Sequence, residues 1–159
     1  MSAVLSDPFD EIAQVQAEHI QAIYEIEQIA YDFPWTEGLL KDCLKTNYHF
    51  YAMFRQGEIL AYGIMSCVLN EAHILNLCVS PSHQRQGLGK QMLDFLLDRA
   101  GLEHSHTVFL EVRQSNQSAQ RLYEANGFNR LGNRKGYYPD NAGREDAVIY
   151  AKELVLNPA

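Results

Sequence analysis

The sequence is poor in positive charge and lacks any long hydrophobic run. Thirteen lysine and arginine residues stand against 20 aspartate and glutamate residues, which gives a net charge of −7. Because a basic surface supplies most of the affinity for nucleic acid, this balance predicts no nucleic-acid partner. No apolar stretch approaches the ~20 residues of a membrane-spanning helix. The acidic residues Asp7, Asp10 and Glu11 come before any apolar stretch, whereas a secretory signal begins with basic residues and then turns apolar. We therefore expect a cytoplasmic protein with no membrane partner.

Cysteine is scarce as well. Cys43, Cys67 and Cys78 form no Cys-x-x-Cys pair, and an odd number cannot close fully into disulfides. His104 and His106 would share one face of an extended segment, but no third ligand accompanies them. The sequence therefore predicts reduced thiols and no metal site.

The length and the hydrophobic patterns predict one α/β domain. A chain of 159 residues fits a single domain. Short turns between the first three strands imply antiparallel pairs, and the later strand–helix–strand passage implies a parallel pair. We expect a mixed central sheet covered by helices on both faces, formed by residues 15–159 after a short acidic extension over 1–14. The predicted helices cover about 17–31, a short stretch after Thr36, 89–101 and 117–126, and the predicted strands cover 49–55, 59–69, 73–79, 107–113, 128–138 and 147–154.

The densest chemical signal is the segment Arg85-Gln86-Gly87-Leu88-Gly89-Lys90, between a predicted strand and a long amphipathic helix. Two glycines let backbone N–H groups converge, and the helix start adds positive partial charge, so this loop can bind phosphate. Gln84 and Met92 occupy positions where a P-loop and a dinucleotide fingerprint need glycine, and a kinase glycine loop covers a hairpin. From these residues alone, a plain turn at a helix start is an equal alternative.

Two side chains are candidates for acid–base chemistry. Glu111 interrupts an apolar strand, where burial would raise its pKa toward that of a useful base. A pair with Arg113, or a solvated edge position, is the alternative for this residue. Tyr123, on the helix that follows, is explained equally simply as a core aromatic beside Leu122 and Phe128.

The loop from Gln84 to Lys90 resembles the Gln/Arg-x-x-Gly-x-Gly/Ala loop of the GNAT superfamily of N-acetyltransferases, which binds the pyrophosphate of acetyl-CoA. The resemblance extends over about 15–154. Within that superfamily the chain is most similar to the bacterial ribosomal-protein-alanine acetyltransferases of the RimI type. The segments that carry this similarity are Phe33-Pro34-Trp35, Leu110-Glu111-Val112-Arg113, Ser115-Asn116, Leu122-Tyr123-Glu124, Gly127-Phe128, Tyr137-Tyr138-Pro139 and Gly143-Arg144-Glu145-Asp146-Ala147.

The resemblance implies direct acetyl transfer, in a ternary complex, from acetyl-CoA to the N-terminal alanine of a basic ribosomal protein. It makes Glu111 the proton acceptor and Tyr123 the proton donor to the leaving sulfur. Phe33, Trp35, Tyr137 and Tyr138 line a peptide groove or belong to the core. The implied acetyl-CoA contacts are Leu77, Cys78, Val79, Arg85, Gln86, Gly87, Leu88, Gly89, Lys90 and Asn116.

Three alternatives accompany this interpretation. The acceptor amine can be a lysine or another small amine. The chain can be an acyl-CoA-binding module without catalysis, although the presence of both Glu111 and Tyr123 argues against this. An acyl-enzyme on Cys78 is disfavoured, because no histidine stands near it in sequence. We expect a monomer.

Overall fold

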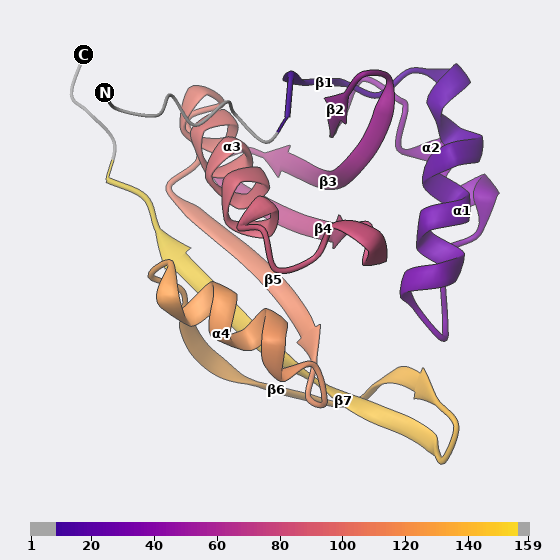
Figure 1. Ribbon diagram of the computed structural model, residues 1–159. Coiled ribbons are helices and arrows are strands. Elements are labelled where there is room, and N and C mark those ends of the chain that lie inside the picture. Colours follow the sequence, from indigo (N-terminus) through magenta and orange to yellow (C-terminus); the bar gives the residue numbers. More distant parts are fainter. Residues whose placement is uncertain (1–8, 156–159) are drawn as a thin grey trace, which may run out of the picture.

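The computed structural model describes residues 9–155, which form a seven-stranded sheet with the order β1-β2-β3-β4-β5-β7-β6 (Figure 1). Only β4 and β5 pair in parallel, and the other neighbours are antiparallel. The predicted mixed sheet is therefore confirmed. The strands are β1 (Glu11–Gln14), β2 (Tyr48–Arg55), β3 (Glu58–Val68), β4 (Glu71–Val79), β5 (Thr107–Arg113), β6 (Asn129–Asp140) and β7 (Gly143–Glu153).

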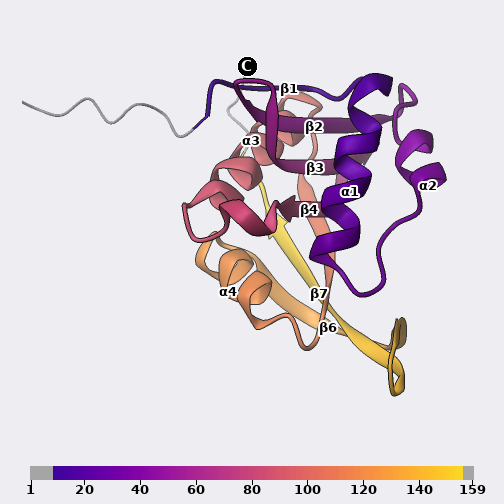
Figure 2. The same ribbon diagram turned by 45° about the vertical axis from the view of Figure 1, so that its right-hand side comes forward.

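Helices cover both faces of this sheet, as predicted. Figures 1 and 2 show α1 and α2 on one face and α3 and α4 on the other. Each face has its own buried cluster: one joins Ile23 of α1 and Leu40 of α2 to the sheet, and the other does so for Leu96 of α3 and Tyr123 of α4. The helices are α1 (Ile20–Ala30), α2 (Glu37–Asp42), α3 (Leu88–Leu102) and α4 (Gln117–Ala125), with 3-10 turns η1 (Ala17–His19) and η2 (Pro81–His83).

Local signals placed several helix ends correctly. The Thr36 hydroxyl accepts a hydrogen bond from the Leu39 N–H at 3.1 Å and so caps α2. Gly127 follows α4 with a φ of +88°, the left-handed conformation in which glycine avoids a steric penalty. These contacts depend on neighbours a few residues apart, so the sequence is enough to indicate them.

Two boundaries differ from the prediction. The acidic segment assigned to an N-terminal extension includes β1, an edge strand in which Ile12 pairs with Met53 of β2. The sheet therefore begins before residue 15, while residues 1–8 lie outside the described part of the chain. At the other end, the stretch 139–146, which the prediction left between the last two strands, is mostly paired strand, with Tyr138 opposite Glu145. Cross-strand pairing outweighs the turn preference of its Asp, Asn and Gly residues.

The pairing of β4 with β5 stops halfway. Residues Glu71–Ile74 pair with Thr107–Leu110, and no pairing follows along the remainder of the two strands. On its other edge β4 carries a bulge: Met65 opposes Ile74 and Ile64 opposes Asn76, which leaves Leu75 as an extra residue. A bulge bends and twists a strand. The two strands therefore diverge just beyond it, and the site lies in the gap between them.

Candidate active site

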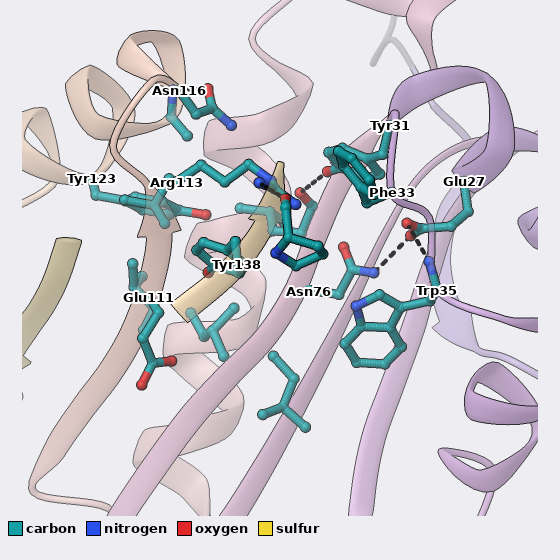
Figure 3. Close-up of a pocket in the computed structure, with 17 residues that line it drawn as sticks. Glu27, Tyr31, Phe33, Trp35, Asn76, Glu111, Arg113, Asn116, Tyr123 and Tyr138 are labelled. Atoms are coloured by element: carbon teal, nitrogen blue, oxygen red, sulfur yellow. Dashed lines mark hydrogen bonds between the residues drawn. The ribbon is translucent and has the colours of Figure 1, made fainter. Parts of the chain in front are cut away.

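The gap between β4 and β5 holds a cavity of about 340 Å³ (Figure 3). Its walls come from α1 and the loop after it, the diverging halves of β4 and β5, the start of α4, and β6. Concave sites of this size are where proteins bind small substrates. Of the residues predicted for function, the cavity brings together Phe33, Trp35, Leu77, Glu111, Asn116, Tyr123 and Tyr138.

Glu111 of β5 lines the cavity, and its carboxylate is held by two basic side chains. One oxygen, Oε2, lies 2.6 Å from His73 Nε2, and the other, Oε1, lies 3.7 Å from Arg134 Nη2. The side chain is 11% exposed. The expectation that burial raises its pKa was wrong: the hydrogen bond from His73 lowers the pKa and outweighs the opposing effect of burial, with the charges of His73 and Arg134 adding to it. The sequence could not reveal this, because both partners come from other strands.

Tyr123 reaches the cavity from α4. Figure 3 shows its hydroxyl directed into the cavity, whereas the Glu111 carboxylate points away from it. Its ring also packs in the core, 5.7 Å from Phe128 and 6.2 Å from Tyr150 between ring centroids. Burial raises the pKa of its phenol well above the ordinary value, so the group keeps its proton at neutral pH. Tyr123 therefore packs as a core aromatic and also borders the cavity, and its role as a proton donor stays a prediction.

The predicted phosphate loop has an unusual backbone. Arg85 and Gly87 have φ values of +65° and +76°, and a non-glycine residue in this region is uncommon. Alternation of left-handed residues turns successive N–H groups toward one concave point. No side chain in residues 9–155 caps the start of α3 at Gly87, so these amides are available to an anion. Lys90 forms an ion pair with Asp94 at 2.7 Å along the helix surface.

The end of β4 next to this loop contains Leu77, Cys78 and Val79, which make different contacts through backbone and side chain. The Leu77 carbonyl accepts a hydrogen bond from the Tyr31 hydroxyl at 3.2 Å. The Val79 side chain lies beside Gly89 of α3. Cys78 is buried in the cluster under α1, outside the cavity lining, and burial raises the pKa of its thiol to about 11. A thiol in that state is a poor nucleophile, in agreement with the low weight given to an acyl-enzyme. All three cysteines are free.

The aromatic candidates divide between the cavity wall and its rim. The Arg113 guanidinium lies between the rings of Phe33 and Tyr138, 5.3 Å and 4.6 Å from their centroids (Figure 3). This contact joins the loop after α1 to β6 across the cavity. Tyr137 does not line the cavity but packs edge-on against Tyr138 at 4.9 Å. Asn116 caps α4 through a 3.1 Å hydrogen bond from the Ala119 N–H and also lines the cavity.

Glu27 of α1 was not among the residues predicted for function. The residue is 1% exposed. Its carboxylate accepts hydrogen bonds from the Tyr62 hydroxyl at 2.8 Å, the Asn76 amide at 2.7 Å and the Trp35 backbone N–H at 3.2 Å. The available signal was its spacing, because Ile20, Ile23 and Glu27 recur at i, i+3 and i+7 and all three are buried.

Along residues 9–155, no group of three or more His, Cys, Asp or Glu side chains is arranged to hold a metal ion. Over the same range, no helix is both long and apolar enough to cross a membrane.

Comparison with known proteins defines the class. The model of the acetyltransferase (GNAT) family matches residues 20–128. The chain therefore belongs to this family, which confirms the resemblance seen in the sequence and places it among the N-acetyltransferases.

Within the family, both a curated relative and solved structures match nearly the whole chain. The [ribosomal protein bS18]-alanine N-acetyltransferase of Escherichia coli (strain K12) is 40% identical over 145 residues, which are 91% of this chain and 98% of that protein. The crystal structure of the ribosomal-protein-S18-alanine N-acetyltransferase from Escherichia coli superposes with a TM-score of 0.87 at 38% identity, covering 93% of this chain and 96% of that one. A GNAT family acetyltransferase from Elizabethkingia anophelis with acetyl-CoA bound shares the fold, with a TM-score of 0.77, 21% identity and coverage of 94% and 100%.

Proposed function

We propose that this protein transfers the acetyl group of acetyl-CoA to the α-amine of an N-terminal alanine on a basic ribosomal protein. The observation that carries the proposal is the cavity at the β4–β5 gap, where Glu111 and Tyr123 border one space. Near-full-length similarity to bS18-alanine N-acetyltransferases supports the choice of substrate. The net charge of −7 favours encounter with a basic partner.

The residues around the gap fit acetyl-CoA. The left-handed residues Arg85 and Gly87 and the uncapped start of α3 supply converging N–H groups for a pyrophosphate. The backbone of Leu77, Cys78 and Val79 would hold the pantetheine arm where β4 is no longer paired with β5, and Asn116 would contact coenzyme A at the cavity wall. When bound, acetyl-CoA supplies the acetyl group as an activated thioester.

Two residues carry the proton transfers in this proposal. Glu111 takes a proton from the substrate ammonium, directly or through water, and the neutral amine then attacks the thioester carbonyl. Tyr123 donates its phenolic proton to the departing sulfur, and the second proton of the attacking nitrogen replaces it as the amide forms. The raised pKa of the phenol keeps its proton in place beforehand. The peptide enters between Phe33 and Trp35 on one side and Tyr138 on the other, with Tyr137 at the rim.

The lowered pKa of Glu111 favours an α-amine over a lysine. At pH 7, an α-amine with a pKa of about 7.7–8.0 costs only ~1 kcal/mol to deprotonate, whereas a lysine costs about 4–5 kcal/mol. A carboxylate that resists protonation is a weak base. It is therefore better matched to the α-amine of a protein N-terminus, which costs less free energy to deprotonate. We also infer that the enzyme is cytoplasmic and monomeric.

The test is mass spectrometry of a synthetic basic peptide that begins with alanine, incubated with the protein and acetyl-CoA. We expect one acetyl group on the α-amine, and its loss in Glu111→Gln. A matched peptide with a blocked N-terminus and an internal lysine is the control. Acetylation of the lysine peptide alone would replace the proposed substrate by a side-chain amine, and acetyl-CoA binding without any transfer would favour a binding module.

Steady-state kinetics test the ternary complex. Initial rates measured against both substrates should give intersecting lines in double-reciprocal plots. Parallel lines, typical of a ping-pong mechanism, would contradict direct transfer.

A further inference from the structure

His73 contacts the Glu111 carboxylate although the two residues lie on different strands. In the parallel pair of β4 and β5, His73 stands opposite Phe109, and Glu111 follows two positions later on the same face. Their closest atoms, His73 Nε2 and Glu111 Oε2, are 2.6 Å apart. Arg134 Nη2 lies at the other oxygen, Oε1, at 3.7 Å, so each carboxylate oxygen has its own basic partner.

The two residues border different spaces. Glu111 lines the main cavity, and His73 does not. His73 lines a second, smaller hollow of about 130 Å³, together with Ser66, Val68, Glu71, Ala72 and Phe109. Exposure rises along the contact, from 11% for the Glu111 side chain to 37% for that of His73. The hydrogen bond therefore connects the enclosed site to a position open to water.

The contact between His73 and Glu111 would assist deprotonation of the substrate amine. This inference rests on the proposed function, in which Glu111 is the first proton acceptor. A carboxyl with an ordinary pKa of about 4.3 is a poor resting place for a proton taken from an α-amine, whose pKa is about 7.7–8.0. An imidazole, ordinarily at about 6.5, lies much nearer the amine. A histidine behind the carboxylate makes removal of the proton far less unfavourable.

We propose that His73 is a positioning residue for acetyl transfer, which receives the substrate's proton through Glu111 and releases it to water at the second hollow. The N–H bond of the ammonium breaks as the proton passes to Glu111 Oε2, and that O–H bond breaks as the proton passes to His73 Nε2. At rest the neutral imidazole donates its Nε2–H to Glu111 Oε2, and exchange with water moves that hydrogen to Nδ1 before the transfer, which frees Nε2 to accept. The imidazolium that forms then loses its Nδ1 hydrogen to water, which restores the resting tautomer. Glu111 ends as the carboxylate it was at the start.

The charged groups around the relay are few. Within residues 9–155, His73 is adjoined by Glu111 on β5 and by Glu71 on its own strand, while Arg134 on β6 reaches the shared carboxylate. Ser66, opposite His73 on β3, carries no charge. Glu111, Glu71 and Arg134 are therefore the charged groups that face the relay within this range.

The test compares the pH profiles of kcat and kcat/KM for the alanine-starting peptide in wild type, His73→Gln, Glu111→Gln and His106→Gln. Glutamine keeps an N–H donor for Glu111 but cannot accept and release a proton. His106→Gln is the matched control, because His106 is an exposed histidine that does not line the cavity. We expect His73→Gln to lower kcat about tenfold near pH 7, less than the ~10²–10⁴ contributed by a whole general base. The acid limb of the profile should move, and KM for acetyl-CoA should stay unchanged.

Chemical rescue supplies a second variant. His73→Ala opens space beside the hollow, so added imidazole should restore activity in this variant and leave wild type unaffected. The same rescue carries the test if His73→Gln does not fold, with circular dichroism to verify the fold of His73→Ala.

The outcomes separate this proposal from the one on which it rests. A wild-type protein that does not acetylate the peptide overturns both. An active wild type with an inactive Glu111→Gln, and with unchanged rate and pH profile in His73→Gln, keeps the proposed function and overturns the relay. A uniform loss at every pH without imidazole rescue also overturns it, because a purely structural contact would behave in that way.

Discussion

Two carboxylates stand on opposite sides of the cavity and differ in every partner they have. Glu27, on the α1 side, is held by a phenol, an amide and a backbone N–H, all neutral donors from three other segments of the chain. Glu111, on the β5 side, is held by an imidazole and a guanidinium. Neutral donors fix a carboxylate in place, whereas ionisable partners let its environment change with protonation.

This difference separates a structural role from a chemical one. The three hydrogen bonds of Glu27 tie α1 to the Trp35 loop, β3 and β4, so they set the shape of one cavity wall. Glu111 lies between the cavity and a partly exposed histidine, which is the arrangement needed to move a proton. Burial alone would not have distinguished them, since the more buried carboxylate, Glu27, is the one held by neutral donors.

The largest effect is expected at Glu111, and it should fall on rate rather than stability. Glu111→Gln should lower kcat by ~10²–10⁴, because a general base is lost. It should change the free energy of unfolding by less than about 1 kcal/mol, because the ion pair with Arg134 is partly exposed. Stopped-flow or steady-state kinetics together with urea unfolding measure both quantities. A variant that is strongly destabilised but fully active when folded would reverse the comparison.

Glu27→Ala should show the opposite pattern and lower the free energy of unfolding by about 3–5 kcal/mol, because three donors lose their acceptor in a buried site. Urea unfolding followed by circular dichroism measures this loss. Glu25→Ala, two residues away and exposed, is the matched control and should stay within ~0.5 kcal/mol of wild type. Equal stability of the two variants would show that the Glu27 network contributes nothing.

Two buried tyrosines extend the same contrast. Tyr123→Phe should lower kcat by roughly 10–100-fold, because the proton donor to sulfur is lost while the ring contacts with Phe128 and Tyr150 are kept. Tyr62→Phe removes only the hydroxyl that bonds Glu27, and it should cost about 1–2 kcal/mol of stability with little change in kcat. Kinetics and urea unfolding of both variants provide the comparison. A larger rate loss in Tyr62→Phe would remove Tyr123 from its proposed role.

The smallest effect is a pH dependence of stability. The pKa of Glu111 is lowered in the folded state, so its carboxylate contributes stability that is fully present above the unfolded pKa of about 4.3. That contribution is lost as the pH falls through the lower folded-state pKa. The stability of wild type relative to Glu111→Gln should therefore decline between pH 5 and pH 3, measured by urea unfolding at each pH. Parallel curves for the two proteins would show that Glu111 has no favourable partner in the fold.

The local elements were predictable because their signals are local. The strand Thr107–Arg113 was predicted with these bounds, and every second side chain of it is buried. The loop from Arg85 to Lys90 was recognisable from two glycines at the start of an amphipathic helix. In the structure, Arg85 and Gly87 of this loop have left-handed backbone conformations. Glu111 and Tyr123, which the sequence made candidates, line one cavity, and their catalytic roles stay a proposal.

The surroundings of these residues were not predictable, because they depend on strands that meet only in the folded chain. The acidic composition of the first residues concealed β1, which exists through its pairing with β2. The expectation for the pKa of Glu111 failed because His73 is 38 positions away in sequence and 2.6 Å away in space.

The sequence by itself determined the class of fold, the glycine loop before α3 and the residue types available for acid–base chemistry, because periodicity, glycine placement and side-chain identity need no distant neighbour. Only the tertiary structure decided where the cavity opens and how its carboxylates are held. The bulge at Leu75 ends the pairing of β4 with β5 and creates the gap. Register then places His73 behind Glu111 and Asn76 beside Glu27. Hydrogen bonds and ion pairs act over a few ångströms, so a charge's environment is fixed by which strands lie side by side.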